Sequence, residues 1–323
     1  MGEGAEIAKA LVSPVNKLID CVRGAAGKIF EPIHIKRMAK ANAFALKTMQ
    51  EAIDSNPELA QAYNSGMIQI DNKDLSSLAV RSIERSLYQE MVKQQNLESV
   101  VAKTYGLLDG EPDVSDEPVD QDWMSRFVNS VETISDEDMQ LLWAKILAGE
   151  IKKPKSYSLR TLEKLKNLSK EEALLFQKYC EFVIAKNGYC YFVNEKELLE
   201  KSCLNVGTIL RFNDCGIAND ATFLNVTYKV SPNEPESFYN DEIIIVCKNK
   251  TSQPIDLNFQ VFALTTFGHN LITIINKNTS NDFLLAFAKY LKKNFTNIEV
   301  RAHSIIKKTE TNITFDEKVD LIS

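Results

Sequence analysis

The helix-boundary signals that decide the fold lie in residues 141–169, LLWAKILAGEIKKPKSYSLRTLEKLKNLS. Just before this stretch, Ser135 followed by Asp138 predicts the start of a helix. The apolar positions of that helix recur at helical spacing, and they are Met139, Leu142, Trp143, Ile146 and Leu147. Gly149 and Pro154 are predicted to end it. The stretch therefore predicts a helix with Trp143 as an anchor of the core.

Two further helices are predicted to follow. Ser158 can begin a helix that has Leu159, Leu162 and Leu165 on one side. Ser169 and Glu172 have the spacing of a capping box for the next helix. Residues 123–185 are therefore predicted to be a helical segment.

The N-terminal part is predicted to be a helical domain over residues 1–108. Ser13 is a good N-cap and Pro14 suits a first helical turn. Apolar residues then recur at helical spacing, and residues 35–106 continue the helical pattern. Long amphipathic helices of this kind usually pair in a bundle and often form contacts between copies of a chain. Strands are expected only after about residue 186.

The first fifty residues are basic within an acidic protein. They contain eight Lys and Arg against four Asp and Glu, whereas the whole chain has a net charge of −6. A basic amphipathic helix can lie on an anionic membrane surface or contact a partner. Alternatively, its apolar stripe is buried against the next helices. The candidate residues for membrane or partner contact are Val15, Lys17, Leu18, Ile19, Val22, Arg23 and Lys28.

Residues 109–122 are predicted to be an acidic linker. Seven Asp and Glu lie among Pro112 and Pro118. Like charges at this density, together with proline, favour an extended or mobile segment. The spacing of the carboxylates does not match a calcium-binding loop, so no metal site is predicted here.

Residues 186–323 are predicted to be a mixed α/β domain with winged-helix-like elements. A strand over 188–193 precedes two short helices over 195–201 and 205–212. Residues 221–230 and 242–247 are then expected to pair as a hairpin, with Thr265 to Gly268 as a later turn. The stretch 194–216 holds three Lys and Arg against four Asp and Glu, which favours protein contacts over DNA reading.

A family resemblance accompanies these patterns. The stretch over 141–169 resembles the signature of an uncharacterised bacterial domain-of-unknown-function family related to the abortive infection alpha proteins. Residues 28–37 with 39–41, and residues 262–271, carry the same resemblance. It implies a role in defence against phage. It brings no catalytic residue to any position of this sequence.

Composition narrows the chemistry further. A net charge of −6 argues against a general nucleic-acid binder. Six Cys lack paired short spacings and are expected to be reduced cytosolic thiols, and three scattered His do not suggest a metal site. No catalytic or cofactor motif occurs, so catalytic residues, cofactor-binding residues, metal ligands and cofactors are all predicted as none. The chain is expected to be cytoplasmic, with a peripheral position on the inner membrane as an alternative.

The predicted fold class is α+β, with an N-terminal helical bundle before a C-terminal α/β domain. The predicted function is that of a phage-defence protein that acts through protein or membrane-surface interaction rather than catalysis. The alternative is a winged-helix regulator that binds nucleic acid, and an unrecognised enzyme stays open as a third class. A protein partner or self-association is the expected form of interaction, before a membrane surface and before nucleic acid.

Overall fold

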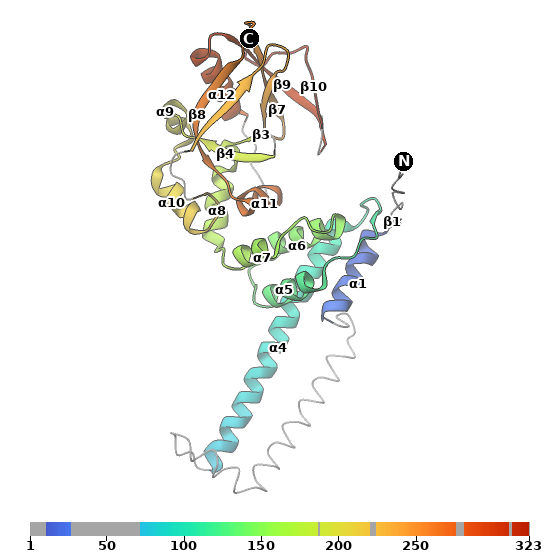
Figure 1. The fold of residues 1–323 in the computed structure, drawn as a ribbon. Coiled ribbons are helices and arrows are strands. Elements are labelled where there is room, and N and C mark those ends of the chain that lie inside the picture. Colours follow the sequence, from blue (N-terminus) through green and yellow to red (C-terminus); the bar gives the residue numbers. More distant parts are fainter. Residues whose placement is uncertain are drawn as a thin grey trace, which may run out of the picture. The chain divides into compact units, whose positions relative to one another are not determined.

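The computed structural model describes residues 11–26, 72–186, 188–219, 224–275, 281–309 and 312–322. The chain combines helices with strands, as the sequence predicts, and most of the described strands form one antiparallel sheet (Figure 1). Its contacts divide it into two compact units, residues 1–159 and residues 160–323. This division differs from the predicted boundaries at residues 108, 122 and 185.

In the described residues, unit 1 consists of helices and one small pair of strands. Its elements are β1 (Leu11–Val12), α1 (Pro14–Ala26), α4 (Asn72–Leu108), β2 (Val114–Ser115), α5 (Gln121–Val131) and α6 (Glu137–Lys152). Helix α4 packs along α6, and α1 packs mainly against α5. The helical pattern predicted over 35–106 is confirmed for residues 72–106, while residues 35–71 lie outside the described residues.

Aromatic rings form the centre of unit 1. Trp143 on α6 is fully buried, which confirms its predicted place in the core. Its ring meets Phe127 of α5 edge-on at 5.5 Å, and Phe127 stacks on Trp123 at 5.3 Å. The indole N–H of Trp123 donates to the carbonyl oxygen of Tyr157 at 2.8 Å. The core thereby fixes the loop after α6 as well as the helices.

The boundaries of α6 differ from the prediction. Its N-cap is Asp136, not Ser135, because the Asp136 carboxylate accepts the N–H groups of Asp138 and Met139. The helix also continues through Gly149 to Lys152. A Cβ at position 149 would lie 2.7 Å from the ring of Tyr157, so the glycine permits close packing and does not end the helix.

Most residues of the acidic segment 109–122 are exposed, and the segment also makes contacts with the rest of unit 1. Its strand β2 pairs antiparallel with β1, with Val12 opposite Val114. Val119 is buried among apolar side chains. Pairing of backbone groups and burial of Val119 outweigh the repulsion between the exposed carboxylates.

Unit 2 begins with helices and is completed by a sheet. Its first elements are α7 (Leu159–Lys166), α8 (Lys170–Tyr179), η1 (Cys180–Phe182), β3 (Val183–Lys186), β4 (Tyr189–Val193), α9 (Lys196–Ser202) and α10 (Val206–Asp214). The later ones are β5 (Leu224–Val230), β6 (Glu236–Tyr239), β7 (Ile243–Asn249), β8 (Ile255–Ala263), α11 (Thr266–Ile274), α12 (Asp282–Asn294), β9 (Ile298–Lys308) and β10 (Ile313–Phe315). The capping box predicted at Ser169 and Glu172 is confirmed at the start of α8.

The sheet of unit 2 is antiparallel and curved. Its strand order is β10-β9-β7-β6-β3-β4-β8-β5. The edge strand β5 nevertheless approaches β6 and β7, and the ring of Tyr228 meets Phe238 at 5.4 Å. Helix α12 covers one face, where Phe287 packs against Phe238 and Phe259. These aromatic rings lie in the hydrophobic core of unit 2, together with aliphatic side chains of the sheet and of α12.

Three predictions about strands and turns are wrong. Strands begin before residue 186, because β1, β2 and β3 precede it. The predicted hairpin is not formed, since β5 pairs with β8 while β7 pairs with β6 and β9. The predicted turn at Thr265 is the start of helix α11, and the Thr265 hydroxyl caps it by accepting the N–H of Gly268.

Candidate functional site

Helix α1 has one buried face. Pro14 begins it, and the carbonyl oxygen of Ser13 accepts the N–H of Lys17 at 3.1 Å. The buried positions follow helical spacing and include a charged residue: Pro14, Lys17, Leu18 and Val22. The face packs mainly against α5, with contacts to α4 and α6. The segment that the sequence selects as an interaction element is thus a docked helix.

The candidate contact residues are split between two faces of α1. Lys17, Leu18 and Val22 are buried, and Val15 is half-buried. Ile19 and Arg23 are exposed. Lys28 lies outside the described residues. In the docked state only part of the predicted stripe is therefore available at the surface.

Residues 114–121, which we call the strap, run beside α1 (Figure 1). At the start of the helix, β1 and β2 pair. Further along, the ammonium group of Lys17 donates to the carbonyl oxygen of Ser115 at 2.9 Å. At its end, the side-chain amide of Gln121 donates to the carbonyl oxygen of Gly24 at 3.1 Å. The strap therefore touches α1 from its beginning to its end.

Lys17 is a charged group in an unfavourable place, with only 7% of its surface exposed. Burial lowers the pKa of Lys17 below its usual value of 10.5. The thiol of Cys21 and the nearby carboxylates of Glu117, Asp116 and Glu150 act in the opposite direction without cancelling this effect. Docking of α1 therefore has a net unfavourable contribution from Lys17, because desolvation of its ammonium group outweighs the attraction to these groups.

Cys21 lies under the strap. Burial raises the pKa of the Cys21 thiol, and contact with the backbone of Val119 and the charge of Lys17 offset this only in part. A thiol with a raised pKa in a half-buried position reacts slowly. Its reactivity can therefore report whether α1 is docked.

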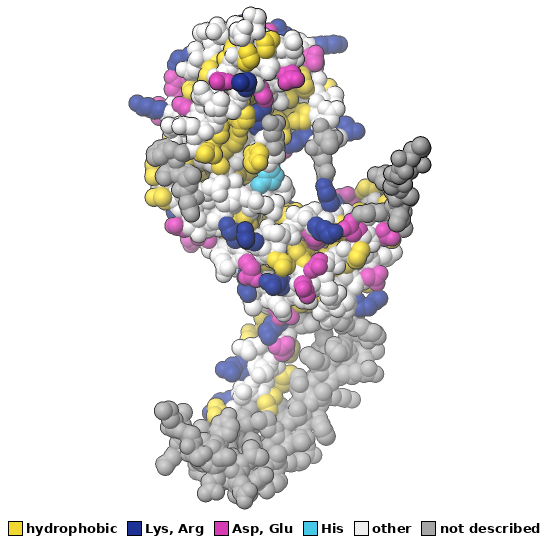
Figure 2. Space-filling model, in the orientation of Figure 1, with side chains coloured by type: hydrophobic (Ala, Val, Ile, Leu, Met, Phe, Trp, Pro, Cys, Tyr) yellow, Lys and Arg dark blue, Asp and Glu magenta, His cyan; other side chains and the backbone are white. Residues whose placement is uncertain are grey.

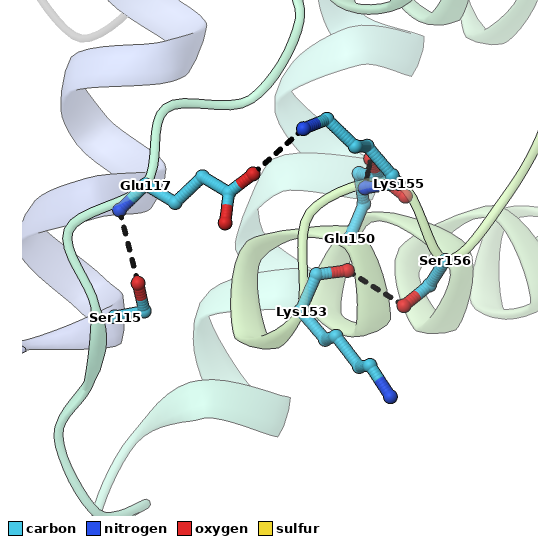
Figure 3. A network of polar contacts seen from close by, with 6 residues as sticks. All are labelled: Ser115, Glu117, Glu150, Lys153, Lys155 and Ser156. Carbon is cyan, nitrogen blue, oxygen red and sulfur yellow. Dashed lines mark hydrogen bonds and ion pairs between the residues drawn. The ribbon is translucent and has the colours of Figure 1, made fainter. Parts of the chain in front are cut away.

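The loop between α6 and α7 supports the strap from the other side (Figure 3). Glu150 is 1% exposed, and its two carboxylate oxygens accept the N–H groups of Lys155 at 2.5 Å and of Tyr157 at 3.0 Å. Lys155 has a φ of 68°, a left-handed conformation that these bonds maintain. Its ammonium group, in turn, reaches Glu117 of the strap at 2.8 Å.

Glu150 is held by opposing effects. Burial raises the pKa of Glu150 above its usual value, while the backbone N–H groups of Tyr157, Lys155 and Ser156 lower it less strongly. In Figure 2, acidic and basic side chains lie interspersed on the surface over the strap and its surroundings. Glu150 could not be predicted as part of this site, because no sequence motif connects it to the strap.

A second cluster of ionisable groups lies inside unit 2. Lys186 on β3 is 2% exposed, forms an ion pair with Glu236 of β6, and lies 4.8 Å from the ring of Tyr228 and 5.1 Å from that of Phe238. Burial raises the pKa of the neighbouring Cys247 thiol to about 12. A buried ion pair between two strands with aromatic neighbours has a sufficient structural role, which is to fix how the strands pack.

The pair α9–α10 presents an apolar surface. Asn205 caps α10 by accepting the N–H of Thr208, and Cys203 before it has a φ of 53°. Val206 and Leu210, one turn apart on α10, are 60% and 49% exposed. Hydrophobic side chains are visible at the surface over α10 in Figure 2.

Other expected groups are accounted for as follows. All six cysteines are free thiols. His303 is buried, stacks on Phe315 at 5.3 Å and contacts the carbonyl oxygen of Val319 through Nδ1 at 2.8 Å. Across the described ranges, no group of three His, Cys, Asp or Glu could hold a metal ion. None of the helices in the described part is long and apolar enough to cross a bilayer.

These features define a mixed α/β protein in which a helical unit carries a docked N-terminal helix. The chain belongs to the family described as "Protein of unknown function (DUF2806)", which matches residues 80–288, more than half of the chain. This confirms the resemblance to a domain-of-unknown-function family. The match begins within α4, so it includes the strap and leaves α1 outside. No curated protein and no solved structure matches the chain.

Proposed function

We propose that this protein acts in the bacterial cytoplasm as a phage-defence protein of the abortive-infection kind, through protein or membrane-surface interaction rather than catalysis. One observation carries the proposal: helix α1 is amphipathic and docks with a buried lysine. A helix that served only the core would place an apolar residue there. The link to defence comes only from the relationship, expected from the sequence, between this domain-of-unknown-function family and the abortive infection alpha proteins.

The docked face of α1 suits a membrane interface once it is free. Each of Leu18 and Val22 contributes about 1.5–3 kcal/mol when its side chain leaves water. A basic residue near an anionic surface, such as Lys17 or Arg23, contributes about 1 kcal/mol. In the docked protein Leu18 and Val22 are already out of water, so the membrane replaces α5 as their apolar environment, and the basic residues would select anionic lipid.

Infection of bacteria that express the full chain tests the defence role. Val22→Asp places a charge on the docked face of α1, and Asn16→Asp makes the same kind of change on the exposed face. We expect wild type and Asn16→Asp to stop growth of infected cells, and Val22→Asp to lose this effect. Loss of Tm in Val22→Asp with growth arrest retained would contradict the proposal, because α1 would then be only a part of the core.

Self-association is the partner interaction that helix α4 supports. Leu78, Tyr88 and Met91 are exposed along it. We expect the mass from sedimentation equilibrium to exceed that of one chain and to fall for Met91→Glu. A monomeric wild type would exclude this part of the proposal.

Protein contact is also our proposal for the winged-helix-like pair α9–α10. Val206 and Leu210 occupy the face that a nucleic-acid reader would equip with basic or amide side chains. The alternative is a nucleic-acid regulator, and fluorescence anisotropy with a labelled duplex tests it. We expect no salt-dependent binding; binding that Arg211→Ala weakens would favour the alternative.

A further inference from the structure

The strap is fixed to unit 1 on one side and holds α1 on the other. Asp120 accepts the N–H of Trp123 at 2.8 Å and so caps α5, and Glu117 is paired with Lys155. On the side of α1, Val114, Ser115 and Gln121 make the contacts described above. The strap therefore ties a helix near residue 20 to a framework more than 90 residues away.

The strap is negatively charged. An anionic membrane surface, for which the basic amphipathic helix α1 is suited, has the same sign of charge. Asp116 and Asp120 are exposed on it, and Glu117 is half-buried. Lys17 lies near the carboxylates of Asp116 and Glu117, yet its ammonium group donates a hydrogen bond to the neutral carbonyl group of Ser115. An anionic surface would attract the basic residues of α1 and repel the carboxylates of the strap.

We propose that the strap is an intramolecular restraint which an anionic lipid surface displaces from α1. The inference rests on the proposed function and adds its regulation. Near anionic headgroups the ammonium group of Lys17 regains water and phosphate oxygens, while Leu18 and Val22 move from α5 to the acyl boundary. The strap stays on its framework through Asp120 and Glu117.

An anionic lipid surface fits this site better than an acidic protein does. The docked face of α1 combines two aliphatic side chains with one cation, a pattern that needs area and diffuse negative charge. The cation on this face is the ammonium group of Lys17, which lacks the planar pair of donors by which an arginine binds one particular carboxylate. An acidic protein partner is the alternative that the experiment separates.

A reversible lock tests the restraint in the full chain. Val12 and Val114 are direct partners across the antiparallel pair, a position whose Cα separation of about 4.5–5.5 Å suits a disulfide. We expect the oxidised variant Val12→Cys/Val114→Cys to bind no phosphatidylglycerol vesicles, and the reduced variant to bind like wild type. Binding of the oxidised variant at the wild-type level would overturn the proposal.

A second experiment measures the docking of α1 in the absence of lipid. The alkylation rate of Cys21, read by mass spectrometry of its peptide, reports how often α1 leaves the strap. Gln121→Ala removes the bond to Gly24 and should raise this rate about fivefold, the effect of one ordinary hydrogen bond. Glu111→Gln is the matched control, because Glu111 pairs with Lys152 outside the strap.

The two measurements separate the restraint from the proposed function. A faster rate for Gln121→Ala together with tighter vesicle binding supports both. An unchanged rate of Cys21 alkylation in Gln121→Ala overturns the restraint, whether or not the protein binds vesicles. A faster rate without vesicle binding by wild type or variant overturns the lipid proposal, removes the membrane part of the proposed function and leaves an acidic protein partner.

Discussion

The ammonium group of Lys17 lies 2.9 Å from the carbonyl oxygen of Ser115, and this hydrogen bond joins residues 98 positions apart in the chain. It is also the point at which docking of α1 is costly, because the charge is buried. The same contact that positions the helix thereby limits how firmly the helix is held.

Lys17→Met should tighten docking near pH 7. It roughly keeps the volume of the side chain and removes the charge that burial penalises. We expect a higher Tm and slower alkylation of Cys21. A lower Tm would show that the bond to Ser115 outweighs the desolvation of the charge.

The pH dependence of this variant has a defined sign. Because the pKa of Lys17 is lowered on docking, the docked state binds fewer protons between that pKa and 10.5. Docking of wild type therefore strengthens as pH rises through this window, and its stability approaches that of Lys17→Met. A difference in Tm that stays constant up to pH 10.5 would contradict the stated cause.

Trp143→Ala should destabilise unit 1 by about 3–5 kcal/mol, the usual cost of removing a buried large aromatic side chain. Phe127 and the helices α5 and α6 lose a shared contact. Chemical denaturation measures the loss, with the exposed Tyr105→Ala as the control. A cost under about 1 kcal/mol would show that the core does not depend on this ring.

Gly268→Ala should destabilise unit 2 strongly. A Cβ at this position would lie 2.2 Å from the carbonyl oxygen of Ile217, so helix α11 or that backbone must move. We expect a loss of about 1–3 kcal/mol, as for overpacked sites. The control Gly106→Ala lies in α4 with open space around it and should stabilise by about 0.5–1 kcal/mol. Equal effects of the two would refute the steric argument.

The buried ion pair of unit 2 should respond asymmetrically. Glu236→Ala leaves Lys186 charged and 2% exposed, whereas Lys186→Met leaves a carboxylate whose side chain is 26% exposed and can be hydrated. We expect the first variant to cost more, about 3 kcal/mol against about 1 kcal/mol in denaturant unfolding. The reverse order would mean that Glu236 bears the cost of burial.

Local signals predicted the helices well. The Ser13–Pro14 start of α1, the capping box of α8 and the buried Trp143 all follow from residues near one another in sequence. The start of α6 was predicted to within one residue. Its N-cap is Asp136 and not Ser135, and either side chain can accept backbone N–H groups of the first turn.

The pairing of strands that are distant in the sequence could not be predicted. Strand β2 exists because Val12 lies opposite Val114, and nothing in either segment alone indicates the other. Strands β5 and β7 are adjacent predicted strands, yet each finds a different neighbour in the sheet. The acidic composition of 109–122 predicts exposure to solvent, and most of the segment is exposed. Composition does not indicate that Val114 pairs with Val12.

Vesicle binding by the full chain shows whether the docked face of α1 is the surface that interacts. Wild type should bind phosphatidylglycerol vesicles and not phosphatidylcholine vesicles. Its binding should fall between about 0.01 M and about 1 M salt, as the Debye length falls from about 30 Å to about 3 Å. Val22→Asp should not bind at either salt concentration. Wild type that binds no more than Val22→Asp, or that binds both lipids equally, would contradict the account.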